Sequence, residues 1–241
     1  MANEQQYRLR VRYGKDGRLA YLGHLEVLHT IDSSIRRSRL PFSVGNGFAR
    51  RMRVQFSQAL PVGASSKAEY YDLVLTEPIE PEVALERLRA STPSALAPTK
   101  AAYVERRAPA LEAWLTRSDW HAELEGTGIT AEALDAAIAA VAETGAIHYM
   151  RGEKPKVADL TRTLVSWQCA QSGDVVELSL QTRSSNEGAL RPAILIDAAF
   201  SAAPLAGAQL AALRVTREMQ AHEEGARLVN PFDENLVISL T

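Results

Sequence analysis

Residues 7–13 alternate strictly between apolar or aromatic and basic side chains, which is the period-two pattern of a half-buried strand. One face of this strand is apolar, and the other carries Arg8, Arg10 and Arg12. From residue 22 to residue 39, apolar residues recur every three or four positions and predict an amphipathic helix. Arg36 and Arg37 fall in its last turn, where cations suit the negative end of the helix dipole.

The remaining patterns of the first half complete a familiar order of elements. Strands are predicted over residues 42–44, 52–56, 69–76 and 101–106, and a second helix over residues 80–90. The order β-α-β-β-α-β is that of a ferredoxin-like, split βαβ unit.

The second half follows this order more faintly. Thr130 is a predicted N-cap for a helix over residues 131–143, and a further helix is predicted over residues 207–220. Strands are predicted over residues 120–125, 164–170, 175–182, 193–197 and 235–240. We therefore expect an α+β protein of two tandem ferredoxin-like (βαββαβ) units with antiparallel sheets, covering residues 1–107 and 108–241.

Charge is distributed unevenly between the two halves. Residues 1–60 contain eleven Lys/Arg and four Asp/Glu, whereas the rest of the chain contains 16 basic and 25 acidic residues. A basic segment joined to an acidic body indicates a polyanionic partner, because phosphate contacts supply most of the affinity for nucleic acid. Alternatively, the basic and acidic faces pair within the fold or across an oligomer.

The arginines of the first strand are the main candidates for such contacts. A ferredoxin-like unit packs both helices on one sheet face, so Arg8, Arg10 and Arg12 are expected on the open face. Arg53 and Gln55 join them if their strand keeps the same parity. Like charges on one face repel, so an anion or acidic groups must lie nearby. The candidates are an RNA phosphate, which guanidinium groups pair bidentately, or acidic residues of the second unit; a simply solvated face is the other reading.

A glycine- and arginine-rich loop over residues 45–53 is the densest cationic feature. Glycines let backbone amides approach a phosphate, although a hairpin with incidental arginines fits the pattern equally well. The complete set of predicted RNA-binding residues is Arg8, Arg10, Arg12, Arg36, Arg37, Arg50, Arg51 and Arg53.

Catalytic chemistry is not specified by these patterns. His24 falls by helical angle near Leu25 and Leu28, so we expect it to point inward, either as a structural residue or as the general base of an RNA-cleaving site. The five histidines lack the spacing of a metal site, and no cofactor is predicted. Cys169 lies in an apolar strand and is expected to be a buried, unreactive residue.

The chain is expected to be cytoplasmic. No run of about 18 apolar residues is present, and residues 1–6 lack the apolar core of a signal peptide.

The segments 17–26, 35–41, 47–48, 60–63 and 69–72 together resemble a family of uncharacterised bacterial domains that accompany radical SAM proteins. The resemblance implies a radical SAM partner protein and an RNA-related task. After Gly47-Phe48 the family usually carries a proline- and histidine-containing stretch, where this chain has Ala49-Arg50-Arg51-Met52. Because one cysteine cannot supply the three thiolates of a radical SAM cluster, that chemistry is expected in another chain.

Three functions follow as hypotheses. The leading one is a non-catalytic accessory protein that binds tRNA or rRNA and presents it to the radical SAM partner. The second is a metal-independent RNA endonuclease, similar in fold to the CRISPR repeat-processing nucleases. The third is a protein-interaction scaffold that contacts no RNA.

Overall fold

The computed structural model describes residues 6–45, 47, 50–185 and 188–239. They form a mixed α+β protein whose strands pair mostly in antiparallel fashion. The chain divides into two compact units, residues 1–115 with 221–241 (unit 1) and residues 116–220 (unit 2). The segment 221–241 therefore belongs with unit 1, whereas the sequence pattern suggests a division after residue 107.

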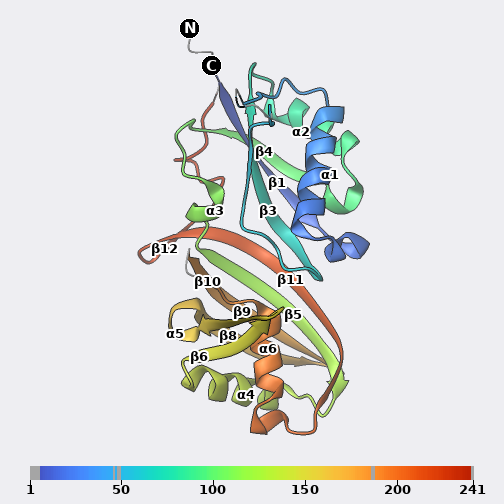
Figure 1. Cartoon of the computed structure of the whole chain (residues 1–241), viewed down its shortest axis with the longest axis vertical. Helices are drawn as coiled ribbons and strands as arrows, with labels where there is room; N and C mark the ends of the chain where they lie inside the picture. The colour runs from blue at the N-terminus through green and yellow to red at the C-terminus, as the bar shows by residue number, and fades with distance from the viewer. Residues whose placement is uncertain (1–5, 46, 48–49, 186–187, 240–241) are drawn as a thin grey trace. The chain divides into compact units, whose positions relative to one another are not determined.

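Unit 1 begins with the expected succession of elements. Its helices and strands are β1 (Tyr7–Lys15), η1 (Gly17–Tyr21), α1 (His24–Arg37), β2 (Val54–Phe56), β3 (Ala64–Leu75), α2 (Pro81–Ser91), η2 (Ser94–Leu96), β4 (Pro98–Val104), α3 (Leu111–Trp114) and β12 (Arg227–Val229). Four strands pair antiparallel in the order β2-β3-β1-β4. Helices α1 and α2 lie on one side of these strands and α3 on the other (Figure 1).

The main core of unit 1 lies between this sheet and the two long helices. Leu9 and Val11 of β1 pack with Ile31 and Ile35 of α1 and with Leu88 of α2, all almost fully buried. The apolar face of the predicted first strand thus faces the helices, as expected. A smaller cluster on the opposite sheet face contains Ala68, Tyr70, Leu111 and Leu115, with Trp114 and Phe232 packed against it.

Unit 2 contains antiparallel strands that pair around β9 (Val175–Ser185) and β5 (Arg117–Thr127). Its elements are β5 (Arg117–Thr127), α4 (Ala131–Glu143), β6 (Ala146–Arg151), β7 (Lys154–Asp159), α5 (Leu160–Thr163), β8 (Leu164–Ser172), β9 (Val175–Ser185), β10 (Gly188–Ala189), α6 (Pro192–Phe200), η3 (Ala203–Leu205) and β11 (Gln209–Glu224), whose last four residues belong to unit 1. Strand β9 pairs with β5, β8 and β10, and β11 lies beside β5. Helix α4 packs against α6 and β8.

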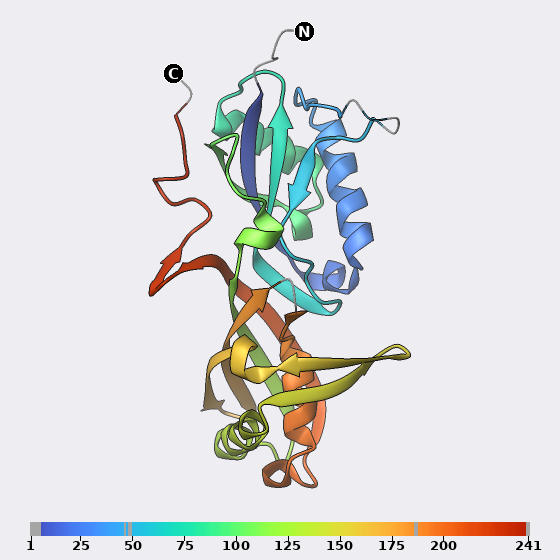
Figure 2. The ribbon, with the colours of Figure 1, turned by 60° about the vertical axis from the view of Figure 1, so that its left-hand side comes forward.

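The Thr130 side chain accepts a hydrogen bond from the Ala133 amide, which confirms the predicted N-cap of α4. Strands β6 and β7 form a separate two-stranded hairpin that was not predicted from the sequence. Figure 2 shows it as the yellow ribbon that extends beyond the rest of unit 2.

Several predicted elements are wrong. The expected helix 207–220 is strand β11, and the expected strand 193–197 is helix α6. The expected strand 42–44 contributes only isolated bridges, Phe42 to Leu75 and Val44 to Met52. In the expected strand 235–240, the described residues contribute one bridge between Val237 and Val104, while residue 240 lies outside the described part.

No helix among the described residues is both long enough and apolar enough to cross a lipid bilayer.

Candidate anion-binding cleft and its buried ion pairs

Arg8 and Arg10 of β1 lie on the sheet face opposite α1 and α2, as their parity predicted, but they are not open to solvent. Arg10 is 1% exposed and Arg8 is 8% exposed. Strand β3 supplies their counter-charge, because Asp72 stands directly opposite Arg10 in the β1–β3 register. The expectation that these two guanidinium groups project from an open face is therefore wrong.

The Asp72 carboxylate receives hydrogen bonds from both arginines. Arg10 Nε donates to Oδ1 at 2.8 Å and Arg10 Nη2 to Oδ2 at 2.9 Å, while Arg8 Nε donates to Oδ2 at 2.9 Å. Such charge-assisted, paired contacts compensate the desolvation of the three buried charges. An acidic group does relieve the repulsion on this face, but it comes from the same sheet and not from unit 2.

Two chain segments cover this part of the sheet face. Arg8 donates to the carbonyl oxygens of Ala108 and Pro109, in the segment that follows β4. Arg10 donates to the carbonyl of Pro231 at 2.9 Å, and its guanidinium lies 5.7 Å from the centre of the Trp114 ring. The face that was predicted to be open is thus closed over by the α3 segment and by the chain's last segment.

Arg12 occupies the end of the same row and is half-buried. Its Nε donates to the Thr99 hydroxyl at 2.9 Å. Tyr70, opposite Arg12 in the register, has its pKa raised to about 12, mainly because burial disfavours the phenolate, while the positive charge of Arg12 acts in the other direction. The Arg12 side chain is thus bound to the neighbouring strand β4 through Thr99.

At the Arg8 end, the covered face opens into a cleft of about 370 Å³. Its walls come from the start of β1, from β2 and β3, and from the segment after β4. The lining residues are Gln6, Arg8, Arg53, Val54, Gln55, Asp72, Val74 and Arg106. Gln55 pairs with Asp72 in the β2–β3 register, so Gln55 does share the arginine face, as parity predicted.

Among the residues that the structure describes, the lining of the cleft carries more positive than negative charge. Arg53 donates to the amide oxygen of Gln6 at 3.0 Å, and Arg8 donates to that of Gln55 at 3.3 Å. Arg106 is exposed and forms no ion pair with any residue in the described ranges. Among the described residues, Asp72 supplies the one carboxylate that lines the cleft, and Arg8 and Arg10 already share it. Guanidinium groups that line a recess bind phosphate or carboxylate anions, because their planar forks match the geometry of these anions.

The other predicted cations lie on the surface of unit 1. Arg36 pairs with Asp32 one turn earlier at 2.7 Å and lies 5.5 Å from the centre of the Phe42 ring. Arg37 donates to the Ser91 carbonyl at 3.1 Å. Both side chains are exposed, so a polyanion can reach them without any change in the fold.

The glycine- and arginine-rich loop leads into Arg53, which lines the cleft. The Gly45 amide donates to the Arg51 carbonyl at 2.9 Å, and the Arg53 amide donates to Ser43. Arg50 and Arg51 are exposed, and Arg50 adopts a positive φ of 41°. Residues 46, 48 and 49 of the predicted loop lie outside the described part of the chain.

We call the surface around the cleft mouth the basic end of unit 1. It comprises Arg50, Arg51, Arg53 and Arg106. Arg36 and Arg37 end helix α1, which covers the other face of the sheet, and are not part of this surface.

His24, the candidate general base, stands at the first position of α1 and is exposed. The grouping of His24 with Leu25 is wrong, because Leu25 is 69% exposed and the buried stripe of α1 is formed by Val27, Ile31 and Ile35. His24 lies on the side of this stripe but stays exposed, so the prediction that it points inward is confirmed only in part. Leu25 lies about 120° around the helix from Ile31.

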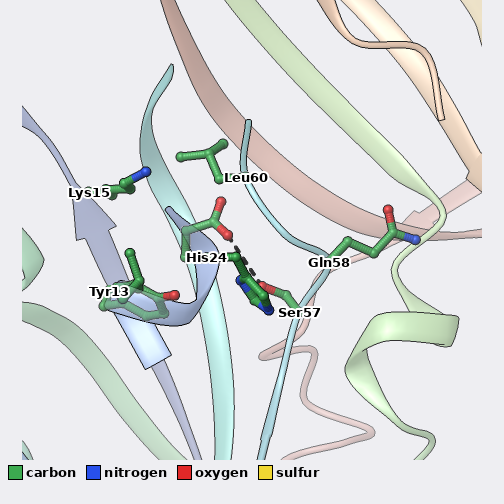
Figure 3. Close-up of a pocket in the computed structure, with 8 residues that line it drawn as sticks. Tyr13, Lys15, His24, Ser57, Gln58 and Leu60 are labelled. Carbon is green, nitrogen blue, oxygen red and sulfur yellow. Dashed lines mark hydrogen bonds between the residues drawn. The ribbon is translucent and has the colours of Figure 1, made fainter. Parts of the chain in front are cut away.

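His24 does line a small cavity with Tyr13, Lys15, Ser57 and Glu69 (Figure 3). Ser57 donates to the Glu69 carboxylate at 3.4 Å, and Ser66 donates to its other oxygen at 2.7 Å. The cavity measures about 10 Å³, which is room for about one water molecule and not for a phosphodiester. The geometry therefore adds nothing to the endonuclease hypothesis.

Sequence reasoning missed three contributors to the cleft: Asp72, Gln6 and Arg106. Asp72 is an acid between the apolar and aromatic residues of segment 70–75, and such a residue in a predicted strand is a signal for a buried partner. Arg106 ends the predicted strand 101–106, and nothing in its local pattern connects it with Arg53.

The fold and the cleft together describe a mixed α+β protein with an arginine-lined recess at one end of an antiparallel sheet. Residues 8–192 match the model of a family described as "Uncharacterized protein conserved in bacteria (DUF2344)". The chain belongs to this family, which confirms the bacterial uncharacterised family inferred from the sequence. No curated protein matches the chain.

Two solved structures are similar to this chain at low sequence identity. A chain of "Crystal Structure of a Cbf5-Nop10-Gar1 Complex" has 11% identity and a TM-score of 0.46; the match covers 90% of this chain and 50% of that one, so this chain spans half of its length. An unknown protein from Galdieria sulphuraria matches with 9% identity and a TM-score of 0.26, over 88% of this chain and 99% of the other. These similarities carry no argument about function.

Proposed function

We propose that this chain is an RNA-binding accessory protein that presents tRNA or rRNA to a radical SAM enzyme. The observation that carries the proposal is the cleft of about 370 Å³ that Arg53 and Arg106 both line, with Arg50 and Arg51 exposed on the adjoining loop. Phosphate contacts by such guanidinium groups supply most of the affinity of RNA binding. The radical SAM partner rests on the resemblance of segments 17–26 and 35–41 to domains that accompany such enzymes. Two tandem ferredoxin-like units remain a prediction for the architecture.

The proposal assigns RNA contact to the basic end of unit 1 and not to the row Arg8, Arg10 and Arg12. The first two arginines share the Asp72 carboxylate and donate to backbone carbonyls that cover them. Moving them to a phosphate would leave the buried Asp72 carboxylate without its partners, which costs several kcal/mol. The exposed arginines carry no such penalty.

A filter-binding titration with tRNA and with an rRNA fragment tests RNA binding. We expect measurable affinity at low salt, reduced when Arg50, Arg51 and Arg53 are replaced together by alanine. The matched control removes three exposed cations elsewhere, Arg18, Arg87 and Arg151. No affinity at low salt, or equal losses in the two triple variants, would refute the proposal.

Co-purification tests the partner. We expect the intact chain to retain a co-expressed radical SAM protein and RNA together. Retention of the protein with no nucleic acid supports the scaffold hypothesis instead, and cleavage of the bound RNA that is abolished in His24→Ala supports the endonuclease hypothesis.

A further inference from the structure

We infer that the cleft beside Arg53 and Arg106 is a site for the phosphate monoester of a nucleotide, carried either by the end of an RNA chain or by a free mononucleotide. If the phosphate belongs to the end of an RNA chain, the inference rests on the proposed RNA binding and makes it more specific. It concerns one recess and not the whole basic end of unit 1.

The charge balance of the recess is the first argument. Within the part of the chain that the structure describes, the guanidinium groups of Arg8, Arg53 and Arg106 line the cleft and that of Arg10 lies directly behind it, against the single carboxylate of Asp72. A phosphate monoester carries a charge of about −1.5 to −2 at neutral pH and has three terminal oxygens. A phosphodiester carries one charge and two such oxygens, so the excess positive charge favours the monoester.

The freedom of the lining groups is the second argument. Arg8 is saturated by Asp72, Gln55 and backbone carbonyls, so it contributes positive potential and does not need to move. Arg53 makes one hydrogen bond to the neutral amide of Gln6, and Arg106 is exposed at the rim. These two side chains are therefore the ones that contact the phosphate, and each can present a bidentate fork.

The size and the remaining walls of the cleft indicate more than an inorganic anion. A volume of about 370 Å³ lies in the range of small-molecule sites, which is about 300–1,000 Å³. Val54 and Val74 supply apolar surface that a ribose or base can contact, and the amides of Gln6 and Gln55 supply donors and acceptors. A nucleotide combines these features in one ligand.

The test compares the ends of one short oligoribonucleotide. Fluorescence anisotropy at constant salt measures its affinity for the full chain with a 5′-phosphate, with a 3′-phosphate and with hydroxyl groups at both ends. We expect at least one phosphorylated form to bind about tenfold more tightly than the hydroxyl form, the gain that a charge-assisted, bidentate contact provides. Arg53→Gln with Arg106→Gln should abolish this preference.

Two controls keep the result specific. Arg106→Gln alone changes an exposed side chain, so it tests the site even if the double variant folds poorly. Arg151→Gln with Lys154→Gln removes the same number of exposed cations from unit 2 and should keep the preference.

The outcomes separate this inference from the proposed function. RNA binding with equal affinity for all three ends overturns the inference and leaves RNA binding intact. Binding of adenosine monophosphate that depends on Arg53 and Arg106, without any RNA binding, supports the monoester site and refutes RNA as its source. Binding of neither probe overturns both.

Discussion

Arg10 of β1 and Asp72 of β3 stand opposite each other in adjacent strands, each 1% exposed, and their side chains join through two hydrogen bonds of 2.8 and 2.9 Å. Asp72 also accepts a hydrogen bond from Arg8. A row of basic residues that resembles a ligand surface in the sequence is, at these two positions, part of the interior of unit 1. The candidate ligand surface shifts to the exposed arginines around the cleft.

Replacing Asp72 by asparagine is expected to destabilise the protein strongly. The change leaves two buried guanidinium groups without a counter-charge, and removing one partner of a buried ion pair costs about 3–5 kcal/mol. Guanidinium chloride denaturation of the intact chain, followed by circular dichroism, measures the free energy of unfolding.

Asp32→Asn is the matched control, because Asp32 pairs with Arg36 at the helix surface at 2.7 Å. An exposed pair of this kind contributes less than about 1 kcal/mol. Equal decreases of stability in the two variants would contradict the structural role assigned to Asp72.

Gly126→Ala is expected to disturb the pairing of β5 with β11. A Cβ at this position would lie 2.1 Å from the Gln209 carbonyl oxygen and 2.7 Å from Ile129 Cδ1, so the backbone must shift. Overpacking of this kind costs about 1–3 kcal/mol. Thermal unfolding should show a lower melting temperature, whereas Gly47→Ala, with nothing within 4 Å, should leave it unchanged. An unchanged melting temperature for Gly126→Ala would argue against the described β11.

Cys169 is expected to react slowly with alkylating reagents in the folded chain. Burial, with a smaller contribution from the negative charge of Asp135, raises the pKa of its thiol to about 12. Because the raised pKa keeps the thiol protonated, the thiolate fraction at pH 8 is about 10⁻⁴. Alkylation by iodoacetamide, followed by mass spectrometry, should accelerate about tenfold per pH unit from pH 7 to 10. A plateau below pH 9, or an equal rate in the urea-unfolded chain, would refute this.

The spacing of apolar residues in the sequence was enough to predict the helices and strands that have a regular pattern of buried positions. Strand β1 and helix α1 have clean two-residue and 3.6-residue patterns, so both were predicted with only small errors at their ends. Helix α4 was also predicted, because its Thr130 cap and alanine-rich sequence act within the segment itself.

The elements that depend on distant partners were not predictable in this way. Strand β11 is rich in Ala, Leu, Arg, Glu, Met and Gln, which are good helix formers, yet it lies as a strand beside β5. The short apolar run of α6 fits a buried strand as well as a helix. For the cleft, the sequence indicated the arginines and their parity, but the burial of Arg10 depends on the β1–β3 register and on Pro231, 221 residues away.

The salt dependence of tRNA binding tests the assignment of RNA contacts most directly. Removing one arginine–phosphate interaction should reduce the steepness of log K against log salt by about 0.9 in a duplex and about 0.7 in a single strand. We predict that Arg50→Ala, Arg51→Ala and Arg53→Ala together reduce this slope by the equivalent of about two to three phosphates. The control variant at Arg18, Arg87 and Arg151 should keep the slope of the unmodified chain. The same slope in both variants would contradict RNA contact through the basic end of unit 1.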